Sequence, residues 1–365
     1  MRYFATAIPG LGAILARELG ALAGVEVDPR RQLDGRNDVV TFAAERPDGL
    51  FGLRTSEDVF VEVATARRAS LGASVRELCD ARALERALSV YAATVRPLRA
   101  GMTFRVIARV LVEREFQRSA LRDALTRALQ QARPRWRVAD PAALELWALE
   151  TQPGRIRMGV RLTSSAMRHR DGRNLERPGA LRPTVAAAMV LLVGPPAPST
   201  ATATLLDPCC GSGTILAEAA AAGWVSIGAD LDPAAVALAY GNLGGTGAGR
   251  LLVADARRLP LADHSVAAIA ANLPFGKQYA VPGSAAAWYA VTLAEFARVT
   301  PDGAAVALLA PATTALRRAL AAQPGLAVED RFDLRLLGMA TTLWQLRRRQ
   351  RRPPLARTPT APRGR

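Results

Sequence analysis

The sequence of 365 residues predicts a multidomain protein in which an α+β front end precedes an α/β unit. Its length allows two or three domains of about 100 to 200 residues each. Half of its residues are hydrophobic, which excludes a wholly disordered chain. Beyond residue 184, short apolar runs alternate with helical patterns. This alternation is typical of a mostly parallel sheet with helices on both faces.

The front end predicts two small units of strands and helices. In residues 1–65, strands are expected at 2–7, 38–42 and 59–63, and a helix at 11–22. In residues 66–165, helices are expected at 78–90 and 119–131, and strands at 104–110, 144–149 and 155–162. Residues 166–183 are polar, rich in arginine and interrupted by turn signals, so we interpret them as a linker.

The α/β unit is expected over residues 184–346. A helix at 184–193 should begin with Thr184 as its N-cap. Strands are then predicted at 204–206, 225–228, 251–253, 266–271 and 304–309, and helices at 214–222, 233–243 and 288–299. Two last strands, at 326–337 and 340–346, would complete a seven-stranded sheet as a hairpin. Residues 347–365 contain eight arginines and no acidic residue, which predicts a disordered tail.

The net charge of +16 is unevenly distributed along the chain. Residues 1–183 carry a net charge of +10 and residues 347–365 one of +8, whereas residues 184–346 carry −2. Basic segments on either side of a nearly neutral unit indicate a partner that bears phosphates, because each neutralised phosphate releases counterions. A bias in composition is the alternative, since Lys277 is the only lysine in the chain.

Several classes of protein are excluded by what the sequence lacks. No apolar run reaches the roughly 18 to 20 residues of a membrane-spanning helix, and the first residues lack the layout of a signal peptide, so a soluble cytoplasmic protein is expected. Cys79, Cys209 and Cys210 are too few for a disulfide framework and are expected to be free thiols. His169 and His264 have no metal-ligand neighbour at a suitable spacing, which argues against zinc and Ser-His-Asp chemistry.

A glycine-containing turn from Asp207 to Thr214 follows the first predicted strand of the α/β unit and opens a helix. Its glycines allow close approach of the backbone to a ligand, and the N–H groups at the helix start can bind a carboxylate or phosphate. A nicotinamide fingerprint would need a third glycine where Leu216 stands. Asp230 and Asp255 follow the next two strands in the same way. The three acids are therefore expected around one crevice, which predicts a nucleoside cofactor.

The segment from Asn272 to Gly276, after the fourth strand, indicates the chemistry. The exocyclic amine of a base is a weak nucleophile because its lone pair is delocalised into the ring. Two acceptors, such as the Asn272 side chain and the Leu273 backbone carbonyl, can hold its hydrogens and direct the lone pair at an electrophile. Phe275 offers a face on which a base can stack. A plain strand-ending turn is the alternative for this pentapeptide taken alone.

Taken together, these motifs resemble those of class I S-adenosylmethionine methyltransferases, which implies a Rossmann-like fold for the α/β unit. Residues 1–346 as a whole are similar to the THUMP-domain guanine-N2 methyltransferases of tRNA, through Ala5–Gly10 at the start and Gly179–Thr184 before the catalytic unit. The resemblance implies an N-terminal ferredoxin-like domain over residues 1–65 and a THUMP RNA-binding domain over residues 66–165.

The resemblance also implies roles for individual residues. The predicted cofactor contacts are Asp207, Cys209, Gly211 and Gly213 for the methionine part of S-adenosylmethionine, Asp230 for its ribose, Asp255 for its adenine, and additionally Thr184, Ser212, Leu231 and Ala256. The predicted catalytic residues Asn272, Leu273, Pro274 and Phe275 are similar to the Asn/Asp-Pro-Pro-Tyr/Phe motif of amino methyltransferases, with Leu273 in place of the first proline. RNA contacts are expected from Arg168, Arg170, Arg173 and Lys277, and no metal is expected.

The leading hypothesis is therefore an enzyme that methylates the N2 amine of a guanosine in the acceptor-stem region of tRNA, acting as a monomer. Guanine N2 in ribosomal RNA and adenine N6 in nucleic acid are the enzymatic alternatives. A non-catalytic RNA-binding protein on the same scaffold is the alternative of another class, and the intact Asn272, Pro274 and Phe275 argue against it. Cytosine C5 methylation fits poorly, because its cysteine nucleophile is missing from the target pocket.

Overall fold

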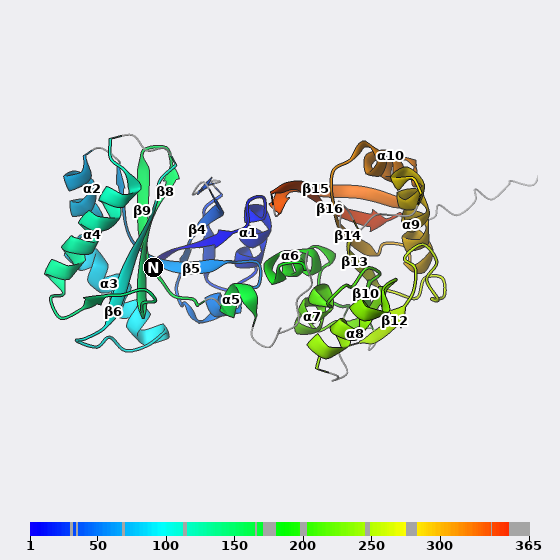
Figure 1. The fold of residues 1–365 in the computed structure, drawn as a ribbon, viewed down its shortest axis with the longest axis horizontal. Helices are drawn as coiled ribbons and strands as arrows, with labels where there is room; N and C mark the ends of the chain where they lie inside the picture. Colours follow the sequence, from blue (N-terminus) through cyan, green and yellow to red (C-terminus); the bar gives the residue numbers. More distant parts are fainter. Residues whose placement is uncertain are drawn as a thin grey trace, which may run out of the picture.

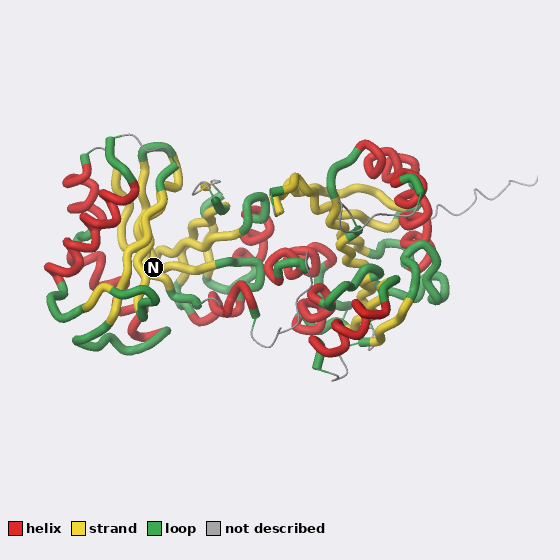
Figure 2. The backbone as a smooth tube through the Cα atoms, viewed as in Figure 1, coloured by secondary structure: helices red, strands yellow, loops and turns green. Residues whose placement is uncertain are grey.

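The computed structural model describes residues 1–29, 32–33, 36–67, 70–111, 115–164, 166–170, 180–197, 203–244, 249–274, 283–336 and 338–349. These residues form two β-sheets with helices packed on them. One sheet belongs to the front end and the other to the α/β unit, and the two halves follow one another along the long axis of the molecule (Figure 1). Figure 2 shows the strands as two separate groups with helices between them. No helix in the described part of the chain is long and apolar enough to cross a membrane.

The front end is built on one nine-stranded sheet. Its strands are β1 (Arg2–Ala7), β2 (Val25–Val27), β3 (Gln32–Leu33), β4 (Asp38–Ala44), β5 (Asp58–Arg67), β6 (Thr103–Arg109), β7 (Arg137–Val138), β8 (Leu144–Gln152) and β9 (Arg155–Arg161). The strand order is β2-β4-β1-β5-β9-β8-β6-β7, and β3 pairs with β4. Because β5 pairs antiparallel with β9, the two predicted units share a sheet. The expected division between residues 65 and 66 falls inside β5.

The helices of the front end are α1 (Gly12–Gly20), the 3-10 helix η1 (Asp48–Gly52), α2 (Leu71–Leu78), α3 (Ala81–Thr94), α4 (Arg118–Ala132) and α5 (Ala166–His169). The single helix predicted at 78–90 is wrong: α2 ends at Leu78 and α3 begins at Ala81. The carboxylate of Asp80 accepts a hydrogen bond from the backbone N–H of Ala83 at 2.8 Å. Asp80 thus caps a new helix, which the apolar periodicity alone does not reveal.

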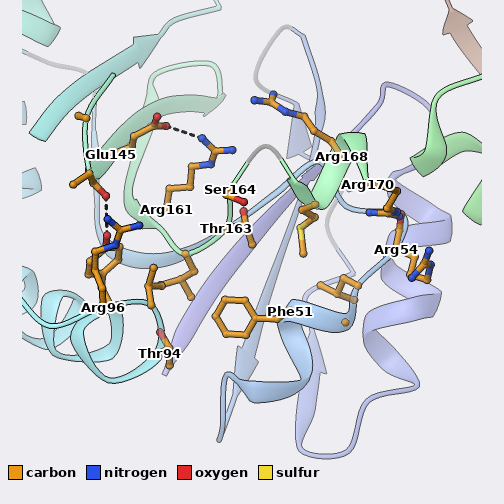
Figure 3. A pocket seen from close by; sticks show the side chains of 18 of the residues that line it. Phe51, Arg54, Thr94, Arg96, Glu145, Arg161, Thr163, Ser164, Arg168 and Arg170 are labelled. Atoms are coloured by element: carbon orange, nitrogen blue, oxygen red, sulfur yellow. Dashed lines mark hydrogen bonds and ion pairs between the residues drawn. The ribbon is translucent and has the colours of Figure 1, made fainter. Parts of the chain in front are cut away.

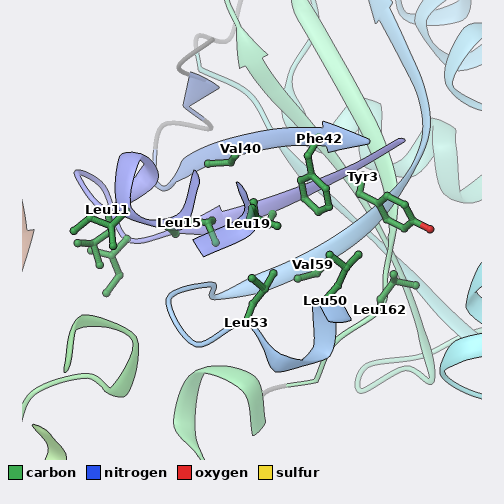
Figure 4. Close-up of a cluster of buried hydrophobic side chains, with 14 of the residues drawn as sticks. Tyr3, Leu11, Leu15, Leu19, Val40, Phe42, Leu50, Leu53, Val59 and Leu162 are labelled. Atoms are coloured by element: carbon green, nitrogen blue, oxygen red, sulfur yellow. The ribbon is translucent and has the colours of Figure 1, made fainter. Parts of the chain in front are cut away.

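The apolar stripe of α1 packs on the front-end sheet (Figure 4). Leu11, Leu15 and Leu19 are fully buried, as their helical spacing predicts. Phe42 of β4 stacks on Tyr3 of β1 with ring centroids 5.7 Å apart. This packing holds the turn between β1 and α1 in a defined position. The same turn reaches the cavity at the strand ends of the α/β unit.

The α/β unit contains the seven-stranded sheet that the sequence predicts, in the order β12-β11-β10-β13-β14-β16-β15. Its strands are β10 (Thr204–Asp207), β11 (Val225–Asp230), β12 (Arg250–Val253), β13 (Ala268–Asn272), β14 (Ala305–Ala310), β15 (Leu326–Leu336) and β16 (Met339–Arg348). The first five strands of this order are parallel, but β16 pairs antiparallel with β14 and with β15. The sheet is therefore mixed rather than mostly parallel, because the short β15–β16 connection reverses the chain.

The helices of the α/β unit are α6 (Pro183–Val193), α7 (Thr214–Ala221), α8 (Pro233–Asn242), α9 (Ala285–Val299) and α10 (Thr314–Ala322). The sequence-based prediction does not include α10. Its buried stripe is short, and the hydroxyl of Thr313 caps it by accepting a hydrogen bond from the N–H of Leu316 at 3.2 Å.

Helix α6 joins the two halves of the molecule. It begins one residue earlier than predicted, with Pro183 in the first turn and Arg182 at the N-cap position, so the N-cap role predicted for Thr184 is wrong. The buried hydroxyl of Thr184 instead donates to the Glu57 carboxylate of the front end at 2.8 Å. Nearly every side chain of α6 is buried, since the helix contacts α1 as well as β13 and β14. The front end and the α/β unit consequently share one hydrophobic core.

Candidate active site

A cavity of about 990 Å³ lies at the carboxyl ends of the parallel strands of the α/β unit. Asp207 ends β10, Asp230 ends β11 and Asn272 ends β13, and all three line the cavity. The strand order reverses direction at β10, which has β11 on one side and β13 on the other. Ligands of open α/β sheets bind at such a switch point, so this cavity is the candidate active site.

The glycine-containing turn has the backbone geometry that the sequence predicts. Gly211 has φ +52° and Gly213 has φ +84°, a region that side chains rarely adopt. Gly211 lines the cavity, and a Cβ atom added there would meet no neighbour within 4 Å. At Gly213 a Cβ atom would lie 3.2 Å from Ala239 Cβ, so this glycine allows α7 and α8 to approach closely. Gly211 can therefore contact a ligand, whereas Gly213 serves packing.

Asp230 fixes this turn. Its Oδ2 accepts a hydrogen bond from the N–H of Gly211 at 2.8 Å, and its Oδ1 accepts one from the N–H of Asp232 at 3.0 Å. A carboxylate oxygen has two lone pairs, so each oxygen can accept a further hydrogen bond from a ribose hydroxyl.

Asp207 is the most buried acid of the cavity. Its Oδ1 accepts a hydrogen bond from the N–H of Cys209 at 3.1 Å. Burial, followed by the nearby Asp230 charge, raises the pKa of Asp207 well above its usual range. Burial also raises the pKa values of Cys209 and Cys210, so both thiols stay protonated. This agrees with their predicted position in a cofactor loop rather than as nucleophiles.

Asp255 is held by a neighbour in sequence. The guanidinium of Arg257 donates to both carboxylate oxygens, with Nη2 to Oδ2 at 2.6 Å, and the Arg257 N–H donates to Oδ1 at 2.9 Å. These hydrogen bonds keep the pKa of Asp255 below its usual value. The carboxylate therefore stays ionised and can accept a hydrogen bond from the exocyclic amine of an adenine.

Asn272 has an unused acceptor. Its Oδ1 is buried, and no hydrogen-bond partner for it is found among the described residues. A buried amide oxygen without a partner costs about 1 to 3 kcal/mol, so such groups need an explanation. The N–H of the adjacent Leu273 donates to Leu309 O at 3.0 Å and anchors the segment to β14. With Pro274 these residues line the cavity, where the Asn272 oxygen is available to a ligand.

The other predicted residues divide into three groups. Ser212, Leu231 and Ala256 line the cavity along with the residues above, whereas Gly213 and Thr184 do not. Arg168 and Arg170 line a different cleft, in the front end. Phe275, Lys277 and Arg173 lie outside the described residues.

Sequence reasoning missed part of the cavity wall. Ile8 and Pro9 come from the turn after β1, Arg36 and Asn37 from the edge of the front end, and Arg335 and Met339 from the β15–β16 hairpin. A signal existed for Ile8 and Pro9, because the segment around them is one of the two that resemble the methyltransferase family. The front end approaches strand β15 of the α/β unit closely, because a Cβ atom added at Gly10 would lie 2.1 Å from the backbone oxygen of Asp333.

Comparison with known proteins identifies the catalytic unit. A family model described as an RMKL-like methyltransferase domain matches residues 170–335. These residues are a methyltransferase domain. A guanine-N2 methyltransferase of U6 snRNA from Bos taurus, THUMPD2, is 41% identical over 105 residues, which are 27% of this chain. The match spans only 20% of that relative's length.

Solved structures match nearly the whole chain. TrmN from Thermus thermophilus is 28% identical, with a TM-score of 0.74 over 95% of this chain and 99% of that one. A protein described as a possible methylase from Clostridium difficile 630 is 17% identical, with a TM-score of 0.68 over 97% of this chain and 99% of that one, and shows the fold alone. The methyltransferase domain, the match to THUMPD2 and the likeness to TrmN together confirm the resemblance to THUMP-type guanine-N2 RNA methyltransferases.

The cofactor that such a methyltransferase domain implies is S-adenosylmethionine, and the cavity fits it. Gly211 leaves open space beside the backbone, and Asp230 and Asp255 offer carboxylate oxygens at successive strand ends. SMU.472, whose structure was solved with S-adenosylhomocysteine, is 15% identical with a TM-score of 0.66 over 96% of this chain and 99% of that one. The described residues contain no group of three His, Cys, Asp or Glu side chains arranged to hold a metal ion.

Proposed function

We propose that this protein methylates the N2 amine of a guanosine in RNA. We further propose that this RNA is tRNA and that the guanosine lies in its acceptor-stem region. Guanine N2 as the target is supported by the activity named for THUMPD2. The choice of tRNA rests on the resemblance of residues 1–346 to the tRNA enzymes of the THUMP family.

The observation that carries the proposal is the unpartnered Oδ1 of Asn272 in the cavity wall. An exocyclic amine that donates one hydrogen to this oxygen and the other to the Leu273 carbonyl turns its lone pair away from both acceptors. S-adenosylmethionine supplies a methyl group that its sulfonium charge activates. The residues of the chain then contribute positioning: Asp230 holds the Gly211 turn, and Asn272 orients the amine.

The front end supplies the attraction for RNA in this proposal. Residues 1–183 carry +10, whereas the catalytic unit carries −2 and would attract a polyanion weakly by itself. Because the two halves share a hydrophobic core, the full chain is the appropriate form for testing this.

The test is to incubate the full-length protein with S-adenosylmethionine and separate pools of unmodified tRNA and rRNA, and to analyse the nucleosides by mass spectrometry. We expect N2-methylguanosine in the tRNA pool. N6-methyladenosine, or methylation confined to rRNA, would replace the proposed target by one of the alternatives. No methylated nucleoside in either pool would refute the proposed activity.

A further inference from the structure

A second cavity, of about 1070 Å³, lies within the front end and is lined by residues of η1, α3, β9 and the linker helix α5 (Figure 3). We call it the arginine cleft, because six arginines line it and Glu145 is its one acidic residue among those described. The cofactor cavity described above contains none of these arginines.

At one end of the cleft two of the arginines are neutralised. Arg161 is buried and forms ion pairs with Glu145 at 3.0 Å and with Asp58 at 2.5 Å. Arg105 pairs with the same Glu145 at 2.6 Å. These contacts stabilise the front-end sheet, and they leave little positive charge for a ligand at this end.

At the other end Arg54 and Arg170 lie side by side and share one carboxylate (Figure 3). Nε of Arg54 donates to Oε2 of Glu218 at 2.7 Å, and Nε of Arg170 donates to Oε1 at 3.0 Å. Nη2 of Arg170 also donates to the backbone oxygen of Arg54 at 2.6 Å. The carboxylate of Glu18 also lies at this end and accepts a hydrogen bond from the backbone N–H of Arg54 at 2.6 Å, so the cleft offers a ligand guanidinium N–H donors rather than a large excess of charge.

The donors of Arg54 are available to a ligand. Its side chain is 39% exposed, and in the described part of the chain its Nη1 and Nη2 have no hydrogen-bond partner. Arg168, also partly exposed, lines the cleft 3.9 Å from Asp58, the carboxylate that pairs with Arg161. Planar guanidinium groups with free N–H donors match the oxygens of a phosphate.

Glu218 connects this cleft to the cofactor cavity. Its side chain is only 3% exposed and belongs to α7 of the methyltransferase domain. The same helix starts with Thr214 and Ile215, which line the cofactor cavity directly after the glycine-containing turn. One buried carboxylate thus sets where the two arginines stand relative to the start of α7.

We propose that the arginine cleft binds a backbone phosphate of the RNA through Arg54 and Arg170, and that Glu218 is a positioning residue that fixes this phosphate site relative to the cofactor cavity. An RNA bound at the cleft then presents its target base to Asn272 at a set distance. The positioning role rests on the proposed RNA methylation, whereas the phosphate site can be tested without any turnover.

The phosphate site is tested by fluorescence anisotropy with a labelled tRNA transcript over a salt series, using full-length protein without cofactor. Arg54→Gln and Arg170→Gln should each lower the slope of log affinity against log salt by about one. Arg54→Lys keeps the charge and should keep the slope. Arg317→Gln is the matched control, because Arg317 is an exposed arginine of α10 away from the cleft. Slopes for the cleft variants equal to that of the control would overturn the phosphate site.

The positioning role is tested with Glu218→Gln, which removes the charge but keeps an acceptor of the same shape. RNA should bind as tightly as before or more tightly, and cofactor affinity by calorimetry should stay within twofold, but kcat with RNA should fall at least tenfold. A merely structural role would lower the melting temperature and cofactor affinity together, and either that result or an unchanged kcat would overturn the positioning role. If the wild type methylates no RNA, the proposed function and the positioning role both fail, while the salt series still decides the phosphate site.

Discussion

Replacing Asn272 with alanine should stabilise the free protein while it disables methyl transfer. The buried Oδ1 has no partner among the described residues, and burying such an oxygen costs about 1 to 3 kcal/mol. Alanine keeps the β-carbon and removes only the amide, so no buried methylene is lost. We therefore expect the free energy of unfolding to rise by about 1 kcal/mol, which for a chain of this length corresponds to a melting temperature roughly 1 to 1.5 °C higher.

Turnover should change in the opposite direction. Loss of one preorganised hydrogen-bonding group at a reacting centre lowers kcat by about 10² to 10³ in well-studied cases. Single-turnover transfer of a labelled methyl group to tRNA measures this effect, and calorimetry with the cofactor alone should show unchanged affinity.

Thr292→Val is the matched control. The hydroxyl of Thr292 in α9 is also buried without a partner among the described residues, and it does not line the cavity. This variant should gain stability but keep full turnover. The reasoning is refuted if Asn272→Ala is less stable than the wild type and transfers methyl groups within threefold of the normal rate.

Three further predictions concern the cofactor and the docking of the front end. Asp230→Asn should weaken cofactor binding by about 1.5 to 3 kcal/mol in calorimetry, and unchanged affinity in a folded variant would contradict the ribose role. Since burial raises the pKa of Asp207 above its usual range, its ionised form, which attracts the cationic cofactor, gains population as pH rises, so affinity should increase with pH and lose this dependence in Asp207→Asn. Gly10→Ala should destabilise the protein by at least about 2 kcal/mol in denaturant unfolding, because φ there is +97° and the Cβ atom would overlap the Asp333 oxygen. Gly20→Ala in α1, which meets no neighbour, should not lower stability, and equal losses in both variants would refute the docking argument.

The sequence by itself determined the chemistry of the strand ends. Asp207, Asp230, Asp255 and Asn272 each follow a short apolar run, and parallel strands must bring such positions to one edge of the sheet. Local signals of this kind depend only on residue type and spacing. In the structure all four of these residues line one cavity. The seven strands of the catalytic unit were predictable for the same reason.

Where local signals were ambiguous, the sequence was misleading. The residues from 78 to 90 carry continuous apolar periodicity, but Asp80 interrupts the helix as a cap. Thr184 has the residue type of an N-cap, yet its hydroxyl is used by Glu57, which is 127 positions away in the chain. Propensity describes a residue in its own segment, and a tertiary hydrogen bond of this kind overrides it.

Only the tertiary structure decided how the two halves meet. The contacts of Gly10 with β15, of Arg54 with Glu218 and of Thr184 with Glu57 join residues that no periodicity relates. They arise because α6 is apolar on every side and must be buried from both directions at once. That requirement docks the front end on the catalytic unit and adds Ile8 and Pro9 to the wall of the cofactor cavity. It also brings the buried carboxylate of Glu218, in the helix that follows the glycine-containing turn, against the arginine cleft.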